Sequence, residues 1–190
     1  MVLLTGCKSS QAGATPSQPS TPSSSAPSTA PSAPASWAAP LDPSAAAQKA
    51  GLPMLGQEVL TVHYHAHLDV TVDGRQVTVP AGIGIDQIRQ AISPLHTHDT
   101  TGIVHIESGQ NVPFTLGQFF TEWGQPLTTH QVGPTTIGNG EVLRVYSNGT
   151  LVTGDPAALK LQAHQEIAVW VGPSTATPTV PSTYQFPAGL

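Results

Sequence analysis

Apolar and polar residues alternate most regularly between residues 60 and 72. One set of alternate positions is apolar and comprises Leu60, Val62, Tyr64, Ala66, Leu68, Val70 and Val72. The other set comprises His63, His65, His67 and Asp69, together with two threonines. Because successive side chains of a strand point to opposite faces of a sheet, the pattern predicts a strand with one apolar face and one histidine face. The apolar face is expected to contact the core.

An Asp-Gly pair at residues 73–74 predicts a tight hairpin after this strand, because both positions of such a turn require positive φ. Pairing Val72 with Arg75 places Val77 opposite Val70 on the apolar face. The turn and the hydrophobic pattern therefore require the same register, which keeps the histidines together on the other face.

A second hairpin is predicted within residues 95–107, with a four-residue turn at residues 99–102. In the register that this turn favours, His96 lies directly opposite His105. The side chains that then share one face are those of His96, His98, His105 and Glu107. If the two hairpins are neighbours in the sheet, their histidines converge.

The C-terminal half of the chain predicts one short helix and further strands. The helix covers residues 115–124, with Thr115 as N-cap, Gly124 at its C-terminal end and aromatic residues directed into the core. Strands are expected at residues 142–146, 151–153 and 167–171, the first two joined by an Asn-Gly turn. These elements predict an α+β fold that is mainly β: a small mixed sheet built from hairpins, with one short helix, and β-grasp-like in its C-terminal half.

The periodic pattern is confined to residues 56–173, which we interpret as one histidine-rich globular domain. Residues 8–55 consist mostly of Pro, Ser, Ala and Thr, a composition that buries too little apolar surface to fold. We expect this segment to be a disordered, semi-rigid linker. Residues 174–190 are again rich in Pro and Thr and are interpreted as a tail.

Residues 3–7, Leu-Leu-Thr-Gly-Cys, resemble the lipobox of bacterial lipoproteins, in which the cysteine is diacylated and becomes the mature N-terminus. No basic residue and no longer apolar run precedes Cys7, so residues 1–7 are interpreted as a truncated signal peptide whose true start is expected upstream. The resemblance implies lipidation at Cys7 and an exported, extracytoplasmic domain anchored to the cell membrane. The alternative is a cytoplasmic protein in which the match to the lipobox arises by chance and Cys7 is a structural cysteine.

The charge and cysteine content exclude several classes of function. The formal net charge is -5 and only 9% of the residues are charged, so the chain has no basic surface for nucleic acid. A single cysteine can form neither an intramolecular disulfide nor a multi-thiolate zinc site. Eight histidines, against six lysines and arginines together, make imidazole the main metal-binding and protonatable group.

Alternate histidines on a strand are a natural metal chelate, because the side chains of residues i and i+2 project to the same side. The candidate metal ligands are His63, His65, His67, His96, His98 and His105, and the carboxylates expected to orient their rings are Asp69, Asp99 and Glu107. The rise of a strand separates His63 from His67 by about 13 Å, which argues against three ligands from this strand on one ion. Neutral imidazole without a domain cysteine favours zinc or copper(II), with iron or manganese if a carboxylate also binds.

Three functions are consistent with this pattern. The leading hypothesis is a lipid-anchored domain that captures, buffers or delivers a transition metal in the cell envelope. A metal-dependent enzyme of hydrolase or oxygenase type is an alternative, with Glu107 or Asp99 as general base. The third is a pH-responsive adhesion or partner-binding module in which the histidines bind no metal. The sequence contains no nucleophile motif or cofactor fingerprint, and it indicates no particular protein partner.

Four segments together resemble those of an uncharacterised family of small exported or membrane-anchored bacterial and archaeal domains. They are His-x-His-x-His-Leu at 63–68, Leu-His-Thr-His-Asp at 95–99, Gly-Ile-Val-His-Ile-Glu at 102–107 and Phe-Thr-Leu-Gly-Gln-Phe-Phe-x-x-Trp-Gly at 114–124. The resemblance covers most of the domain and implies that these histidines belong together, but it implies no activity. The aromatic-rich stretch usual in the family before Leu-His-Thr-His is replaced here by Ala-Ile-Ser-Pro at 91–94.

Overall fold

The computed structural model describes residues 36–58 and 61–190. The predicted signal at residues 1–7, the lipidation site Cys7 and most of the predicted linker lie outside the described residues. Within the described ranges, no helix combines the length and the apolar character needed to cross a lipid bilayer.

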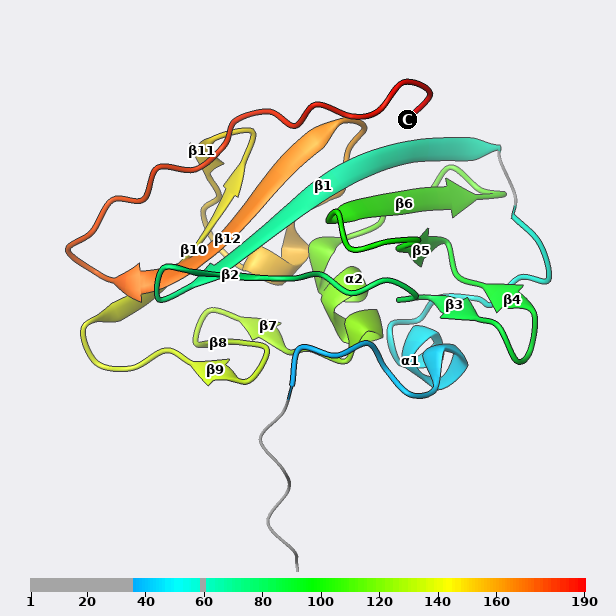
Figure 1. The fold of residues 1–190 in the computed structure, drawn as a ribbon, viewed down its shortest axis with the longest axis horizontal. Coiled ribbons are helices and arrows are strands. Elements are labelled where there is room, and N and C mark those ends of the chain that lie inside the picture. The colour runs from blue at the N-terminus through cyan, green and yellow to red at the C-terminus, as the bar shows by residue number, and fades with distance from the viewer. Residues whose placement is uncertain (1–35, 59–60) are drawn as a thin grey trace, which may run out of the picture. The chain divides into compact units, whose positions relative to one another are not determined.

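One mixed sheet forms the framework of the domain, in the strand order β11-β10-β12-β1-β6-β5, with β2 also paired to β1 (Figure 1). Its strands are β1 (Val62–Val72), β2 (Arg75–Val77), β5 (Leu95–His96), β6 (Ile103–Ser108), β10 (Glu141–Ser147), β11 (Thr150–Leu151) and β12 (Gln165–Pro173). The central pair, β1 and β12, is parallel, and the other pairs are antiparallel. The fold is therefore α+β and mainly β, as the sequence predicts.

The remaining elements are short. They are the helices α1 (Pro43–Lys49) and α2 (Leu116–Trp123), the 3-10 helix η1 (Pro156–Ala158), and the small strands β3 (Ile85–Asp86), β4 (Ala91–Ile92), β7 (Leu127–Thr128), β8 (Gln131–Val132) and β9 (Thr135–Thr136). Strand β3 pairs with β4, and β7, β8 and β9 form a small sheet of their own. The main sheet takes strands from both halves of the chain, because β12 lies between β1 and β10, whereas the predicted β-grasp-like arrangement is confined to the C-terminal half.

Both predicted hairpins have the expected register. In the first hairpin, both residues of the turn at 73–74 have positive φ, and the cross-strand pairs are Val72 with Arg75 and Val70 with Val77. In the second hairpin, His96 pairs with His105. Strand β6 of the second hairpin also pairs with β1, so the two hairpins are neighbours in the sheet.

Helix α2 closes the core on one side of the sheet. Thr115 and Gln118 form a capping box at its start, in which each side chain bonds to the backbone N–H of the other, and Gly124 ends the helix with a φ of 77°. Three aromatic residues of α2 are completely buried, as predicted: Phe119, Phe120 and Trp123. They belong to the same core as apolar residues of β1, β6 and β12, among them Ala66, Leu68, Val70, Val104, Ile106, Ile167 and Val169. The histidine face of β1 is left on the opposite side of the sheet.

Glu122 is an acidic residue on the buried face of α2. Its side chain is fully buried, and neither carboxylate oxygen has a hydrogen-bond partner among the described residues. Burial raises the pKa of Glu122 from its ordinary value of 4.5 to about 8. Between these two pH values the folded state retains a proton that the unfolded state has lost. The free energy of unfolding should therefore fall as the pH rises from about 4.5 toward 8.

Replacing Glu122 by glutamine is expected to remove this pH dependence. The variant should match the wild-type protein in unfolding free energy at pH 4, where both side chains are neutral. At pH 8 the variant should be more stable than the wild-type protein by on the order of 2 kcal/mol. At this pH the buried glutamate must either keep a proton that it would lose in water or carry a buried charge, whereas glutamine is neutral in both states. Urea unfolding at both pH values, followed by circular dichroism in the presence of a chelator, measures the difference. If the difference in unfolding free energy between the variant and the wild-type protein stays constant from pH 4 to pH 8, the pKa of Glu122 is not raised by burial.

The segment 36–55, which its composition assigns to the linker, packs on the domain instead. The ring centroid of Trp37 lies 5.3 Å from that of Trp123, and Ala47 and Leu52 belong to the core. Consecutive alanines give α1 a high helix propensity and a small cross-section, so it can lie close to α2. Composition alone does not separate such a helix from a disordered Ala-rich linker.

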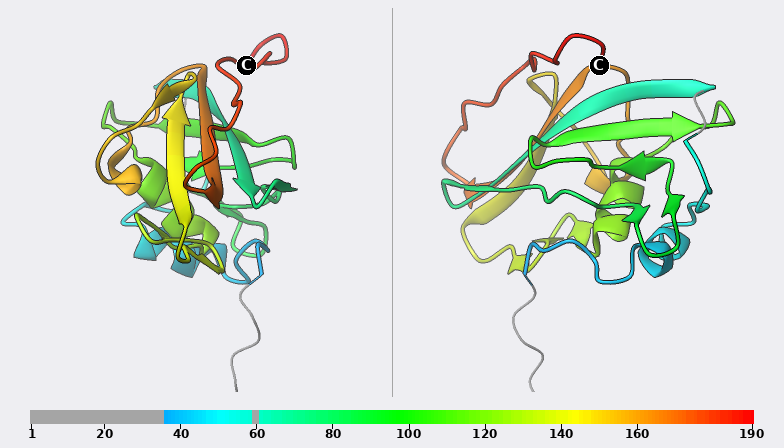
Figure 2. Two further views of the ribbon diagram at one scale, coloured as in Figure 1. Left: turned by 90° about the vertical axis from the view of Figure 1, so that its left-hand side faces the viewer. Right: turned by 45° about the vertical axis from the view of Figure 1, so that its right-hand side comes forward.

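The C-terminal tail, residues 174–190, runs along the sheet face opposite α2 (Figure 1, Figure 2). At its start, the Arg144 guanidinium donates hydrogen bonds to two backbone carbonyls of the tail. Further along, the ring of Tyr184 stacks on that of His67, with centroids 3.7 Å apart and planes 6° from parallel. The tail therefore packs on the face that carries the histidines.

Candidate metal centre

Three histidines lie side by side across adjacent strands near the edge of the main sheet. His65 of β1 pairs with His105 of β6, which pairs on its other side with His96 of β5. Because directly opposed residues of neighbouring strands point to the same face, these rings share the side of the sheet away from the core. The ring centroids of His65 and His105 are 4.5 Å apart, and those of His96 and His105 are 5.2 Å apart.

His63 and His98 complete the group, since each lies two residues along the chain from His65 or His96 and so projects to the same side. Nε2 of His65 is 3.1 Å from Nε2 of His63 and 3.1 Å from Nδ1 of His105. The ring of His98 is edge-on to that of His105, with centroids 4.5 Å apart. We call His63, His65, His96, His98 and His105 the histidine cluster.

Two sets of three ring nitrogens in the cluster have the spacing of metal ligands. One ligand nitrogen from each of His63, His65 and His105 lies within 4.8 Å of the other two, and the same holds for His96, His98 and His105. A tetrahedral ion bound at about 2.1 Å to each nitrogen needs these nitrogens roughly 3.4 Å apart. Small side-chain rotations therefore suffice for either set to hold a metal ion.

Glu107 is the carboxylate at the centre of the cluster. Its Oε1 lies 3.3 Å from Nε2 of His63, 3.7 Å from Nδ1 of His105 and 3.9 Å from Nε2 of His96. The side chain is 6% exposed, and Oε2 has no hydrogen-bond partner among the described residues. Burial raises the pKa of this carboxyl group. The structure thus brings Glu107 into contact with the rings that the sequence analysis places beside it.

The ring of His96 is held with one nitrogen free. Nδ1 lies 2.9 Å from the carbonyl oxygen of Ser93, and because a carbonyl only accepts, Nδ1 carries the proton and Nε2 a lone pair. His96 is completely buried, and its Nε2 has no hydrogen-bond partner among the described residues. A backbone carbonyl that accepts from the second ring nitrogen is a common arrangement for a metal-binding histidine.

Three histidines of the cluster are kept neutral by their surroundings. Burial, followed by repulsion from the neighbouring imidazoles, lowers the pKa of His65 to about 4 and that of His105 to about 3. Burial also lowers the pKa of His96 to about 4, against the opposing effect of its hydrogen bond to Ser93. At neutral pH these rings are uncharged, and the neutral imidazole is the form that binds a metal.

His67 lies apart from the cluster and contacts a different strand. Its Nδ1 is 2.7 Å from Oε2 of Glu166 on β12, and its Nε2 donates to the carbonyl of Thr101 at 2.9 Å. Burial is the largest single effect and opposes protonation of the ring, but the hydrogen bond and the negative charge of Glu166, together with the Thr101 carbonyl and Asp69, outweigh it and raise the pKa of His67. With both nitrogens bonded and Tyr184 stacked on the ring, His67 links β1, β12 and the tail.

The two predicted aspartates have other contacts. Asp99 accepts hydrogen bonds from the backbone N–H and the hydroxyl of Thr101, so it closes its own turn. Asp69 accepts from Nε2 of Gln76 at 2.9 Å and is grouped with His67 and Glu166 rather than with the cluster. Neither aspartate has a hydrogen bond to a ring of the cluster among the residues that the structure describes.

Sequence patterns miss two glutamates that lie beside these histidines. Glu58, shortly before β1, has a carboxylate oxygen within 4.8 Å of ligand atoms of His96 and Glu107. It lies in a short polar segment without periodicity, which carries no signal for a site. Glu166 pairs with His67 across the parallel strands β1 and β12, and 99 positions separate the two residues in the chain. No local pattern reports such a pairing.

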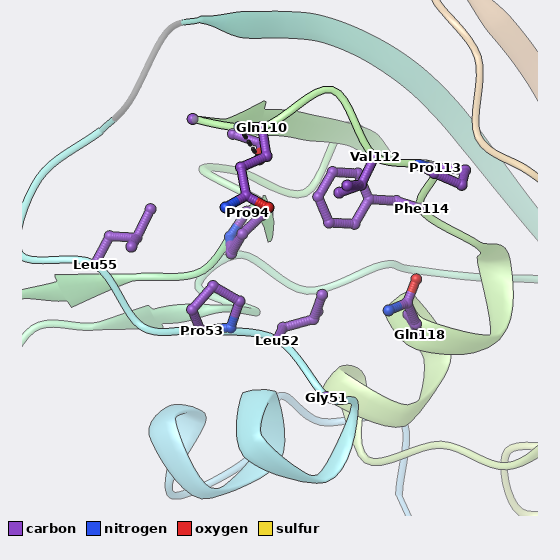
Figure 3. A pocket seen from close by; sticks show the side chains of 12 residues that line it. Gly51, Leu52, Pro53, Leu55, Pro94, Gln110, Val112, Pro113, Phe114 and Gln118 are labelled. Carbon is purple, nitrogen blue, oxygen red and sulfur yellow. Dashed lines mark hydrogen bonds between the residues drawn. The ribbon is translucent and has the colours of Figure 1, made fainter.

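A pocket of about 380 Å³ opens between the segment after α1 and the loop from β6 to α2 (Figure 3). Its mainly apolar walls include Leu52, Pro53, Pro94, Val112 and Phe114. None of the cluster histidines lines it, so it does not form a substrate site over an ion held by the cluster. The pocket therefore lends no support to the enzyme alternative.

No protein-family model, curated protein or solved structure matches this chain. The resemblance to the family of exported domains therefore stays a prediction.

Proposed function

We propose that the histidine cluster binds a divalent transition metal, with zinc or copper(II) favoured, and that the domain captures, buffers or delivers this metal in the cell envelope. The observation that carries the proposal is the free Nε2 of His96, which is buried without a hydrogen-bond partner among the described residues. An unbonded buried acceptor is unfavourable by about 1–3 kcal/mol. A metal ion among the neighbouring nitrogens would give this lone pair a partner.

The chemistry of the donors supports zinc or copper(II). The cluster supplies neutral imidazoles and the carboxylate of Glu107, a set that suits these ions better than the hard cations magnesium and calcium. The chain's single cysteine, Cys7, precedes the domain, so a thiolate from the folded part cannot bias the site toward softer ions.

The exposure of the ligands supports capture and release. His65 and His96 are buried, whereas the side chain of His63 is 36% exposed and His98 is exposed. An ion bound between them is accessible from solution on one side without unfolding of the domain. Exchange with a donor or acceptor of metal can take place at that side.

Anchoring to the cell membrane through Cys7 is part of the proposal. It is supported by the lipobox-like residues 3–7 and by the Pro/Ser/Ala/Thr-rich sequence that follows them. A lipid anchor followed by an extended linker would hold the metal-binding domain at a distance from the membrane. A domain in the extracytoplasmic compartment would also be exposed to metal ions before they cross the cell membrane.

Metal content and affinity test the proposal directly. The full chain, produced without a histidine tag, is dialysed against a weak chelator, analysed for bound elements, and titrated with zinc and copper(II) by calorimetry. We expect submicromolar affinity for at least one of the two ions, and a thermal stability that rises with metal concentration because the ion binds the folded state. Affinity weaker than about 10 μM for both ions, equivalent to less than about 7 kcal/mol of binding free energy, would exclude this function.

A further inference from the structure

The cluster offers more ligands than one ion accepts. Five imidazoles and Glu107 lie together, and Glu58 approaches from the segment before β1. A zinc site in a protein is almost always four-coordinate, so a single zinc ion would leave several of these groups without a role as ligands. The two ligand triads share only His105, which stands on the strand between the other two.

The topology separates the two His-x-His pairs. His63 and His65 stand on β1, and His96 and His98 belong to the β5 segment on the other side of β6. Two strands that flank a third are roughly 10 Å apart. Each pair therefore approaches the middle strand from its own side, and each meets His105 there.

Glu107 lies between the two pairs, with one carboxylate oxygen near histidines of both pairs and the other without a partner among the described residues. Its Oε1 is within 4 Å of nitrogens of His63, His96 and His105, which come from all three strands. Its Oε2 is buried and has no hydrogen-bond partner among the described residues. A carboxylate in such a position can place one oxygen on each of two cations about 3.5–4 Å apart.

We propose that the histidine cluster holds two divalent transition-metal ions, one on His63 and His65 and the other on His96 and His98, bridged by Glu107. His105 lies between the two positions, and Glu58 completes the ligands of the ion on the His96 side. The inference rests on the proposed metal-binding function and extends it, since it assigns a second ion and a bridging carboxylate. Two buried atoms without partners, Nε2 of His96 and Oε2 of Glu107, each gain one.

Copper(II) provides a test because two bridged ions interact magnetically. The full, untagged chain is titrated with copper(II) and with zinc, bound metal is counted by elemental analysis after dialysis, and electron paramagnetic resonance spectra are recorded along the copper titration. We expect two equivalents of either metal. The second copper equivalent should reduce the signal per ion and produce a half-field transition, which isolated ions lack.

Variants at each position assign the two equivalents. His63→Ala and His98→Ala remove exposed ligands, so each variant should fold and bind one equivalent without the half-field transition. Glu107→Gln should retain the first equivalent and weaken the second about tenfold. The exposed His130, outside the cluster, provides the matched control, because His130→Ala should still bind two coupled ions.

The possible outcomes separate this inference from the function on which it rests. No bound metal would overturn both. One equivalent in the wild-type chain, or two equivalents without magnetic interaction, would overturn the two-ion site and leave the proposed function standing. Loss of the second equivalent in His130→Ala would place that ion outside the cluster and overturn the inference as well.

Discussion

Replacing His105 by alanine is expected to weaken zinc and copper(II) binding about a hundredfold, equivalent to about 2.7 kcal/mol of binding free energy. His105 is the residue that both ligand triads contain, and its Nδ1 lies 3.1 Å from Nε2 of His65. Its loss therefore removes a ligand from either set and leaves a gap between β1 and β5. Competition titration against a chromophoric chelator measures the change in affinity.

The control for this prediction is His130→Ala, which removes an exposed histidine that the structure places outside the cluster. Its affinity for both metals should equal that of the wild-type chain. The thermal unfolding of metal-free His105→Ala should be recorded in parallel, so that loss of folding is not mistaken for loss of a ligand. A folded His105→Ala protein with unchanged affinity would show that the cluster is not the metal site.

The metal-free protein is expected to lose stability steeply as the pH falls from about 6.5 to about 4. The pKa values of His65 and His96 in the folded state are lowered to about 4 and that of His105 to about 3, whereas a histidine in an unfolded chain titrates near its ordinary value of 6.5. In this window the unfolded state binds protons that the folded state does not, so stability is complete above pH 6.5 and decreases below it. Since one pKa unit corresponds to about 1.4 kcal/mol per group and each of these three pKa values is lowered by about 2.5 or more, we expect a total loss on the order of 10 kcal/mol by pH 4.

Chemical unfolding at pH values between 8 and 4, with a chelator present, measures this loss. His67 and Glu122 act in the opposite direction, because the raised pKa of each adds stability that persists at low pH and is lost as the pH rises through the folded pKa. The cluster contribution is therefore isolated by comparison with His65→Gln, whose pH slope should be smaller by about one proton. Equal slopes for the two proteins between pH 6.5 and 4.5 would show that His65 is not held neutral in the folded state.

The local part of the candidate site could be predicted from the sequence because it depends on short-range rules. The alternation through His63 and His65 identifies a strand face, and the turn at 99–102 fixes which residue lies opposite His105. That β6 lies next to β1 is a non-local fact, but two antiparallel hairpins with complementary apolar faces have few other arrangements.

The remaining part depends on contacts between distant segments. The parallel pairing of β1 with β12 brings Glu166 to His67 and withdraws that histidine from the cluster, although the strand pattern presents it as equivalent to His65. In the same way, Trp37 and α1 pack on α2 from within a segment of linker-like composition. The composition of a segment shows how much apolar surface that segment can bury by itself. It does not show that another part of the chain will cover the segment, as α2 does here.

The contact of Trp37 with Trp123 also fixes the beginning of the described chain on the helix side of the domain. Trp37 stands near the first described residue and packs against the end of α2, while the histidine cluster lies on the face of the sheet away from the core. Ser36 therefore lies on the helix side of the sheet, where its carbonyl oxygen accepts a hydrogen bond from Nε2 of Gln125. Among the described residues, the flanking segment that shares the cluster's face is the C-terminal tail, where Tyr184 stacks on His67, so a soluble ion or a second protein reaches the cluster beside the tail and on the side opposite Ser36.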